Sequence, residues 1–551
     1  MTRPDLAADP VTHATATPAP APKLAVGVLL RALDIPVWQH AALESIAGSS
    51  HSELALAIVV PGGAEGTQVR SAAQSILARI VARLDARMVC EVDALELKDA
   101  RALLERVSVL QRAPAVIAEA LAGRGLDVLV DLGGVAPPRE IAALVRHGVW
   151  SVTQPYSVSA DAAEASFWPV YHGWAVGEAV LEETRADGSR VALATTTPAT
   201  NPFSLKLNAS ALCWRIAALV PQTLRRLHEE GAQRLPQSTD RAPSAMRSDA
   251  PLEAPGTAAL ARYVARNVTR RARASAARRF MLDQWILLYR RGDALSTAPA
   301  EFTKLVPPKD RFWADPHLVR RHGRYYAFIE ECPFDTGKGH IAVLSLGDDG
   351  TWSAPVKVLE REYHLSYPFV FEHDGELYMV PESEANRTID LYRCTDFPQH
   401  WEHVRTLLTD IAATDSTLIE HDGRWWLFAN VVDNPGASFS DELYLFHSDA
   451  LTGPWKPHRR NPIVSDARRA RPAGAIMRRE GRLLRPAQDC SVRYGYGVRL
   501  HEIERLDEAE YREREIERIE PTWDGRIVAV HTLSHVPGLT MLDALQPRLR
   551  F

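Results

Sequence analysis

The second half of the chain repeats one order of residue types, and this repetition constrains the fold more than any other feature of the sequence. Three stretches share the order: DRFWADPHLVRRHGRYYAFIEE from Asp310, LSYPFVFEHDGELYMVPES from Leu365 and TDSTLIEHDGRWWLFAN from Thr414. In each, an apolar strand leads through a charged turn with glycine into an aromatic strand. Units of about fifty residues that contain four short strands each are typical of a β-propeller.

Tryptophans recur late in the first three units, and the number of units sets the number of blades. Trp352, Trp401 and Trp455 each follow an apolar strand, so we expect them to pack within the blades rather than to bind a ligand. The count favours five blades, with four or six as the alternatives. The strand DQWILLYRR at Asp283–Arg291 and the segment TWDGRIVAVHTLS near the end of the chain are expected to share the last blade. Closure by the two chain ends would remove exposed sheet edges.

The innermost strand of every blade faces the propeller axis, so the residues that open each unit should converge there. These residues differ from unit to unit while the scaffold around them repeats, which indicates that they serve a site. We predict that four of them are near neighbours: Asp315, Tyr367, Asp415 and Arg471. The partner positions at the ends of the aromatic strands are Glu330 or Glu331, Glu382, Asn430 and Gln488.

A ring of carboxylates, aromatic residues and one arginine suits a polyhydroxylated or amino sugar. Carboxylates accept hydrogen bonds from hydroxyls or an ammonium group, and arginine holds a carboxylate or phosphate. The alternative interpretation is a buried structural ion network. His317 and His340 are more typical of structural histidines, and no metal site is predicted. The catalytic candidates are Asp315, Asp415 and Glu331, and the substrate-binding candidates in this half are Lys338, Tyr367, Glu382, Arg471, Gln488 and Tyr494.

The first and third units resemble the five-bladed propellers of furanosidase-type glycoside hydrolases. The resemblance implies that Asp315 is a general base and that Asp415 tunes the general acid. The fourth unit offers ARPAG, with Arg471, where the resemblance requires the acid. Because most glycoside hydrolysis needs a pair of carboxyl groups, the acid is left unassigned.

A series of motifs occurs in order from about Asp283 to Phe551: FWADPH, KGHI, HLSYPFVF, YMVPES, DST with WWLF, GPW followed by HRRNPI, ARPAG and RPAQDCSVRYGYGV. In these motifs the chain more closely resembles the N-terminal propeller domain of plant glucosamine inositolphosphorylceramide transferases. In the plant protein a separate glycosyltransferase domain follows the propeller. The resemblance implies a role in glycan or glycolipid biosynthesis.

The first half of the chain alternates short apolar strands with helical segments. LAVGVLL, the helical VWQHAALESIAG and LALAIVV form a strand, helix and strand unit, and LDVLVDLGG is a further continuous apolar strand. Strands buried on both faces in this way are typical of a parallel sheet covered by helices. We expect an α/β, Rossmann-like domain over residues 23–228.

The block SFWPVYHGWAVGEAVLEETRADGSRVALAT resembles the formyltransferase fold of methionyl-tRNA and amino-sugar formyltransferases. The resemblance implies that Asp187 and Gly188 match the Asp-Gly pair that closes the family's site. Thr153 and Gln154 lie where the family carries an Asn-x-His signature, so Asp187 would be the only base. We favour a degenerate domain that binds a partner or a sugar nucleotide. The alternative is a folate-dependent sugar N-formyltransferase, and only that alternative requires a cofactor, 10-formyltetrahydrofolate.

The local composition of the chain predicts the remaining domain boundaries and bears on the possible binding partners. Residues 1–22 are expected to be a disordered lead, residues 229–256 a linker rich in proline, serine and alanine, and residues 257–551 the propeller with a leading helix. That helix, ALARYVARNVTRRARASAARRF, is rich in arginine, which fits either a solvated helix between domains or peripheral membrane contact. The net charge of -5 argues against nucleic acid.

Three functions follow as hypotheses. The first is an enzyme of the glycosyltransferase type that transfers or processes an amino sugar in the propeller, the second a noncatalytic sugar-binding scaffold, and the third the formyltransferase. The partner is expected to be a sugar, a sugar nucleotide or a glycolipid. Five scattered cysteines, no apolar run long enough to span a membrane and no signal peptide predict a cytoplasmic protein. The sequence leaves the oligomeric state open.

Overall fold

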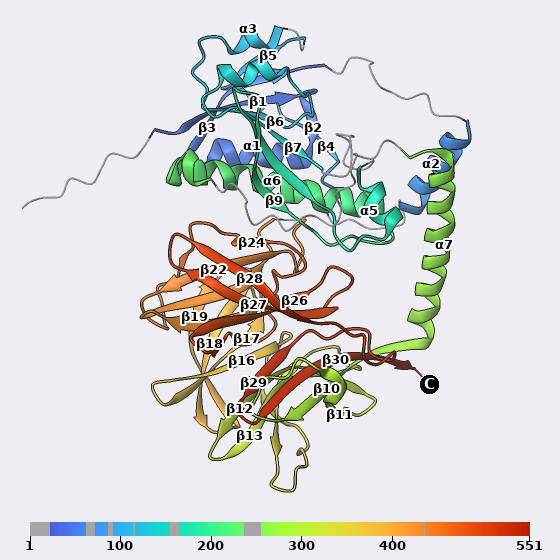
Figure 1. Ribbon diagram of the computed structural model, residues 1–551, viewed down its shortest axis with the longest axis vertical. Coiled ribbons are helices and arrows are strands. Elements are labelled where there is room, and N and C mark those ends of the chain that lie inside the picture. Colours follow the sequence, from blue (N-terminus) through green and yellow to red (C-terminus); the bar gives the residue numbers. More distant parts are fainter. Residues whose placement is uncertain are drawn as a thin grey trace, which may run out of the picture.

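An α/β domain, a long helix and a β-propeller make up the part of the chain that the computed structural model describes (Figure 1). Residues 1–21 of the expected lead over residues 1–22, and most of the expected linker over residues 229–256, lie outside the described residues. The described residues are 22–61, 72–85, 92–113, 116–154, 165–235, 255–434 and 436–550.

The N-terminal domain is built on a seven-stranded sheet with the strand order β5-β3-β1-β6-β7-β8-β9. The first five strands of this order pair in parallel, and β8 and β9 extend the sheet as an antiparallel hairpin. The predicted parallel sheet is therefore confirmed, while the formyltransferase-like identity stays a prediction. The strands are β1 (Leu24–Leu30), β3 (Ser52–Val59), β5 (Ser108–Gln111), β6 (Val128–Asp131), β7 (Val149–Thr153), β8 (Ala179–Thr184) and β9 (Arg190–Thr196).

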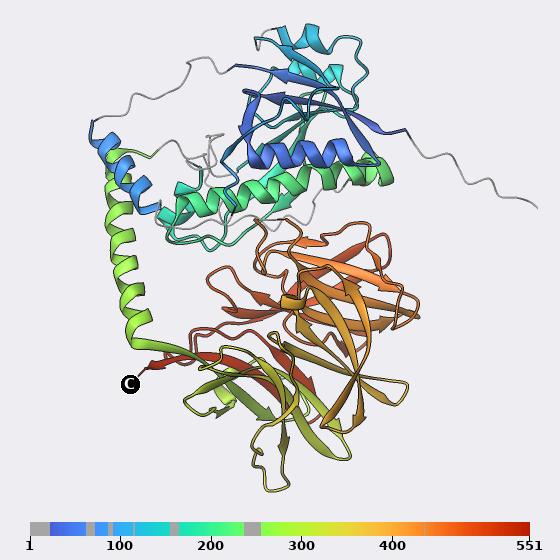
Figure 2. The same cartoon turned by 180° about the vertical axis from the view of Figure 1, so that it is seen from behind.

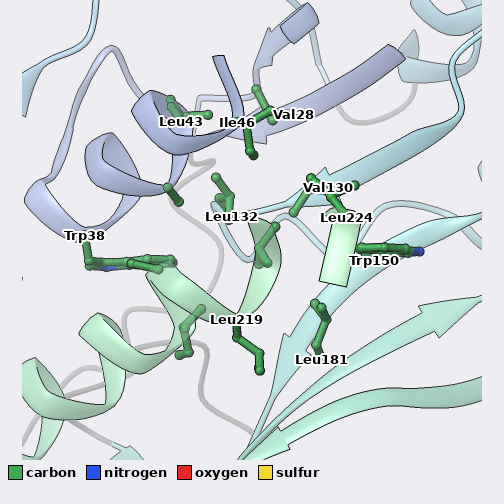
Figure 3. Close-up of a cluster of buried hydrophobic side chains, with 14 of the residues drawn as sticks. Val28, Trp38, Leu43, Ile46, Val130, Leu132, Trp150, Leu181, Leu219 and Leu224 are labelled. Atoms are coloured by element: carbon green, nitrogen blue, oxygen red, sulfur yellow. The ribbon is translucent and has the colours of Figure 1, made fainter. Parts of the chain in front are cut away.

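Helices cover both faces of this sheet. On one face, α1 (Val37–Gly48) and α6 (Leu205–Glu230) form the larger core with the strands, and Figure 3 shows side chains of both helices meeting those of the sheet. On the other face lie α3 (Ile117–Leu121) and η2 (Arg139–Leu144). Smaller elements are β2 (Asp34–Pro36), β4 (Leu97–Asp99), α2 (Ala72–Asp85), α5 (Phe167–His172) and η3 (Ala232–Arg234).

The C-terminal half forms five antiparallel sheets, as the repeat predicts, and these are the five blades of the propeller. Blade 1 contains β12 (Arg311–Arg321), β13 (Arg324–Pro333), β14 (His340–Leu346) and β15 (Val356–Leu359). Blade 2 contains β16 (Ser366–His373), β17 (Glu376–Ser383), β18 (Thr388–Asp396) and β19 (His400–Thr409). Blade 3 contains β20 (Ala413–His421), β21 (Arg424–Val431), β22 (Glu442–Ser448), β23 (Lys456–Pro457) and β24 (Val464–Ser465). Blade 4 contains β25 (Met477–Arg479), β26 (Arg482–Asp489), β27 (Gly497–Leu506) and β28 (Tyr511–Ile519).

The two ends of the propeller segment share blade 5 and close the ring. Strand β10 (Met281–Arg291) pairs antiparallel with β30 (Leu539–Leu549) along its whole length, with β11 (Thr303–Leu305) and β29 (Leu533–Val536) at the two sides. The predicted sharing of the last blade by the strand at Asp283–Arg291 is confirmed. Because the ring closes in this way, the inner strands are held around one axis.

A buried ion pair joins the two domains. Arg215 Nη1 of α6 lies 2.6 Å from Glu442 Oε2 of β22, and both side chains are almost fully buried. Nearby, the Thr196 and Ser465 hydroxyl oxygens are 2.8 Å apart. The indole of Trp214 packs so closely on Gly436 that any side chain there would collide with it. The linking helix α7 (Thr257–Phe280) runs along the outside from α2 to β10 (Figure 2).

Replacing the arginine of this pair should weaken the protein strongly. We expect Arg215→Met to cost about 3–5 kcal/mol of folding free energy, because Glu442 is left as an unpaired buried carboxylate. Chemical denaturation measures the loss. The double variant R215M/E442L should recover most of it, since an apolar pair of similar volume can replace a buried ion pair. A loss in the double variant equal to the sum of the two single losses would contradict the pairing.

Candidate functional site

The same backbone distortion, a β-bulge, occurs in the inner strands of blades 1, 2 and 3. The pairing register is interrupted at equivalent places in β12, β16 and β20. At each interruption one residue adopts a left-handed backbone conformation: Asp315 with φ 52°, Tyr367 with φ 41° and Asp415 with φ 52°. Such bulges re-aim a side chain out of the regular alternation of a strand. The three residues are among those that the sequence predicts at the axis.

Each of these bulges frees a backbone N–H group, which donates to a carboxylate of the preceding blade. Asp315 N donates to Asp543 Oδ2 at 2.9 Å, Tyr367 N to Asp315 Oδ2 at 3.2 Å and Asp415 N to Glu382 Oε2 at 3.2 Å. These bonds connect blade 5 to blade 1, blade 1 to blade 2 and blade 2 to blade 3. Residues about fifty positions apart thus meet around the axis, as the repeat predicts.

Asp415 is held by two side chains of blade 4. Arg471 Nε donates to Asp415 Oδ2 at 2.6 Å, and Gln488 Nε2 donates to the same oxygen at 2.7 Å. Arg471 Nη2 also lies 3.4 Å from Glu382 Oε2. Burial, together with the charge of Asp415, raises the pKa of Glu382 well above its usual value. The group therefore combines a fixed carboxylate, an arginine and a second carboxyl group whose pKa is raised.

Asp315 belongs to a second chain of ionisable groups. His531 Nδ1 lies 2.7 Å from Asp543 Oδ2, and His531 Nε2 lies 3.3 Å from Asp315 Oδ1. The Thr532 hydroxyl donates to Asp315 Oδ1 at 2.9 Å. Burial raises the pKa of Asp315 to about 7 although His531 opposes the shift. Burial lowers the pKa of His531, but Asp543 and Asp315 outweigh that effect and bring it to about 9.

The spacing of these three groups also admits a metal ion, but their bonds favour proton sharing. Ligand atoms of Asp315, His531 and Asp543 all lie within 4.8 Å of one another. However, Asp543 Oδ2 already accepts from Asp315 N and faces His531 Nδ1. A histidine must be neutral to bind a metal, whereas these two carboxylates stabilise its protonated form. The arrangement therefore fits an acid-base relay.

Two exposed aromatic residues contact Arg471, Tyr494 through its ring and Phe439 through its backbone carbonyl. Tyr494 is 47% exposed and Phe439 is 41% exposed. Arg471 Cζ lies 5.0 Å from the centre of the Tyr494 ring, and Arg471 Nη1 donates to the Phe439 carbonyl at 2.8 Å. Exposed aromatic faces beside buried polar groups are what a ligand with both CH and hydroxyl surfaces requires. We call Arg471, Tyr494 and Phe439 the rim.

In the structure Glu330, rather than Glu331, belongs to the residues at the axis. Register pairs Glu330 with Ala314, next to the bulge, as Glu382 and Asn430 pair in blades 2 and 3. Because neighbouring residues of a strand point to opposite faces, Glu331 lies on the face toward blade 5. His364 Nε2, beside Glu330, lies 3.0 Å from its Oε1.

The Glu331 carboxylate is held by three side chains and has a structural role. Trp313 Nε1 donates to it at 3.0 Å, Arg311 Nη1 donates to it at 3.1 Å, and His340 Nε2 lies at 3.1 Å. Burial acts to raise its pKa, but these hydrogen bonds outweigh burial and lower it to about 2. A carboxylate so firmly bonded is a poor acid-base catalyst.

Of the other predicted residues, Tyr367 and Gln488 are buried around the axis and bonded within the propeller. The Tyr367 hydroxyl lies 2.8 Å from Thr417 Oγ1 and accepts from Gly474 N at 2.8 Å, so it joins blades 2, 3 and 4. Gln488 is fully buried against Asp415. Both therefore position the site rather than contact a ligand.

Two further predicted residues lie away from the axis residues. Lys338 Nζ donates to the Arg361 carbonyl at 2.9 Å, on the loop between β13 and β14. Asp187 is exposed in the turn between β8 and β9 of the N-terminal domain, where its carboxylate accepts from Ser189 N at 2.8 Å. The structure does not bring either of them together with Asp315.

The sequence reasoning missed the contribution of blade 5. His531 and Thr532 lie within the segment predicted to join the last blade, at the entrance of its inner strand. That position is equivalent to Asp315 in blade 1. Asp543 follows on the next strand, and Trp285 stacks on His531 with ring centres 4.1 Å apart. Here no repeated motif marked the copy.

Part of the propeller is similar to a known protein family. Residues 299–528 match the family model described as glucosamine inositolphosphorylceramide transferase 1, N-terminal. The chain is 40% identical over 205 residues to glucosamine inositolphosphorylceramide transferase 1 of Oryza sativa subsp. japonica, covering 37% of this chain and 27% of the relative. The Arabidopsis thaliana protein of the same name is 37% identical over 220 residues, covering 39% and 28%. The chain thus spans about a quarter of the length of these relatives.

Solved structures with a similar arrangement are more distant. One is Zg3597, a family 117 glycoside hydrolase of Zobellia galactanivorans, with 13% identity over 48% of this chain and 91% of that chain and a TM-score of 0.31. Another is the catalytic domain of the Coprinopsis cinerea GH62 alpha-L-arabinofuranosidase, with 15% identity over 43% and 93% and a TM-score of 0.34.

Removing the central histidine should change both stability and its pH dependence. His531→Phe leaves Asp315 and Asp543 without their counter-charge, which we expect to cost about 3–5 kcal/mol. Since its folded pKa is raised to about 9 from 6.5, the contribution of His531 is fully present below pH 6.5 and is lost as the pH rises through 9. Denaturation curves from pH 6 to 10 should show this decline in the wild type and not in the variant.

His317→Phe is the matched control. His317 is a buried imidazole packed edge-on against Phe369 at 5.1 Å, and burial lowers its pKa to about 3. It is neutral above pH 6, so its removal should leave the decline unchanged. An identical effect of both substitutions would contradict the relay.

Proposed function

We propose that the propeller site binds and transfers or processes an amino-sugar glycosyl group on a glycolipid related to inositolphosphorylceramide. The match of residues 299–528 to the transferase family supports the class of substrate. The observation that carries the proposal is the bulged inner strands, which gather ionisable side chains at one axis beside exposed aromatic rings.

The charge balance of the site favours a cationic, hydroxylated ligand. The carboxyl groups around the axis outnumber the cationic groups that face them, so an ammonium group would relieve their mutual repulsion. Hydroxyls of a sugar would donate to carboxylate oxygens, and its CH faces would stack on Tyr494. The carboxyl groups are Asp315, Glu330, Glu382, Asp415 and Asp543, and the cationic or titratable partners are Arg471, His364 and His531.

The carboxyl groups differ in the role that each can fill. Asp315 exchanges a proton near neutral pH, because its pKa lies at about 7, and the relay through His531 stabilises its charged form. It would accept the proton of an attacking hydroxyl. The raised pKa of Glu382 favours its protonated form, and its side chain is partly accessible, so it would donate its proton to the oxygen of the leaving group. Asp415 would position Arg471 and Glu382.

A noncatalytic sugar-binding scaffold is the second candidate. Both oxygens of Asp315 already accept hydrogen bonds, from Thr532 and from the backbone of Tyr367. Both oxygens of Asp415 face Arg471. A site with its carboxylates so engaged can recognise a sugar without reacting with it. The two candidates share the same residues and differ in turnover.

Two isosteric substitutions test the catalytic roles. We expect Asp315→Asn and Glu382→Gln each to lower the rate of glycosyl transfer by at least about 10²-fold, because each removes one proton-transfer group. Mass spectrometry of inositolphosphorylceramide incubated with amino-sugar nucleotides detects the product. Glu504→Gln, on β27, the third strand of blade 4, should leave the rate unchanged. Full activity of D315N would exclude the mechanism, and saturable binding without product in the wild type would establish the scaffold.

Ligand preference tests the charge balance directly. Glucosamine should bind at least about tenfold more tightly than N-acetylglucosamine, because acetylation removes the ammonium charge. Calorimetric titration measures both affinities. Tyr494→Ala should weaken glucosamine binding by about tenfold through loss of the stacking face, whereas Tyr496→Ala, two residues away, should not. Equal affinity for the two sugars would contradict an amino-sugar site.

A further inference from the structure

We propose that the end of α7 docks on an anionic membrane surface. The docking surface consists of Arg278, Arg279, Phe280, Leu549 and Arg550, which we call the basic tip. It lies where the linking helix enters blade 5, at the C-terminal end of the described chain (Figure 1).

The linking helix is strongly basic along its whole length. Its sequence holds arginine at positions 262, 266, 270, 271, 273, 278 and 279 and contains neither aspartate nor glutamate. The first half is packed on the N-terminal domain: Leu260 and Tyr263 are buried, and Arg266 donates to the Tyr171 carbonyl at 3.0 Å. From Ser275 to Phe280 every side chain is exposed. The arginines at the end of this second half are therefore available to a partner.

Two chain segments bring apolar side chains to the same place as these arginines. Phe280 is 49% exposed and Leu549 is 62% exposed. Leu549 pairs with Met281, the residue after Phe280, and Arg550 N donates to the Phe280 carbonyl at 3.0 Å. Two large apolar side chains thus stand among three exposed arginines. The acid two strand positions away, Asp283, lies 3.3 Å from Arg493 and is already paired.

This composition fits a lipid surface better than other anionic partners. Arginines attract acidic headgroups, and exposed phenylalanine and leucine insert at the boundary between headgroups and acyl chains. A nucleic acid would interact with the arginine charges but would leave the apolar side chains exposed to water. The part of the chain that the structure describes has no helix long and apolar enough to span a bilayer, and surface docking needs none.

The basic tip is close to the candidate site along one strand. Trp285 lies four residues after Met281 on β10, a separation of about 14 Å in an extended strand. The Trp285 ring is 6.4 Å from that of Tyr494 at the rim and stacks on His531. This part of the inference rests on the proposed function: a protein docked through the tip would hold its candidate site near the headgroups of a glycolipid.

Vesicle sedimentation with the full chain tests the docking without any requirement for turnover. At 0.1 M salt the protein should sediment with vesicles of phosphatidylcholine containing 30% phosphatidylserine and not with phosphatidylcholine alone. The variant R278Q/R279Q/R550Q should lose at least tenfold in apparent affinity, and F280S/L549S should lose binding that persists at higher salt. Melting curves check that each variant is folded.

The matched control removes three arginines from another surface. R512Q/R514Q/R518Q changes the net charge equally on the exposed strand β28, where each arginine pairs with a glutamate. It should bind the acidic vesicles as the wild type does. Equal loss in the control, equal binding to neutral vesicles, or displacement of the acidic vesicles by duplex DNA at matched phosphate concentration would overturn the proposal. Failure of glycosyl transfer with intact vesicle binding would instead overturn only the proposed function.

Discussion

A β-bulge occurs in the inner strand of three successive blades, and the rest of the site depends on it. Each bulge forces a residue with a side chain into a left-handed conformation, at a cost of about 1–3 kcal/mol. It also frees a backbone N–H group that, once buried, must find an acceptor. In this propeller the acceptor is always a carboxylate of the preceding blade. A hydrogen bond contributes about 0.5–1.5 kcal/mol when the acceptor is neutral and about 1.5–3 kcal/mol when it is charged, so these bonds offset much of the strain.

The same bonds explain the electrostatics of the axis. Three carboxylates placed to accept backbone N–H groups stand close together, so they cannot all be ionised without compensation. Arg471 compensates Asp415 and, in part, Glu382, while His531 compensates Asp315 and Asp543. The repulsion that these cations leave uncompensated, together with burial, raises the pKa values of Glu382 and Asp315. The chemistry of the site is thus a consequence of how the blades are tied to one another.

The sequence was sufficient for the scaffold and for the residues that the repeat marks. Strand order, blade number and the convergence of Asp315 and Asp415 follow from units that recur at a regular interval. The choice between Glu330 and Glu331 depends on strand register, which a one-residue shift inverts and which sequence spacing does not fix. His531 was not predicted from the sequence, because blade 5 combines segments from both ends of the propeller. Contacts between such segments leave no local pattern in the sequence.

The loop between β21 and β22 connects the site to the N-terminal domain. The Phe439 carbonyl of this loop holds Arg471, while Gly436, three residues earlier, lies against Trp214 of α6. The loop ends at Glu442, the partner of Arg215 in the buried ion pair. A shift of α6 would therefore move the loop and, with it, the arginine that orients Asp415. This loop therefore connects α6 of the α/β domain to the arginine that holds Asp415.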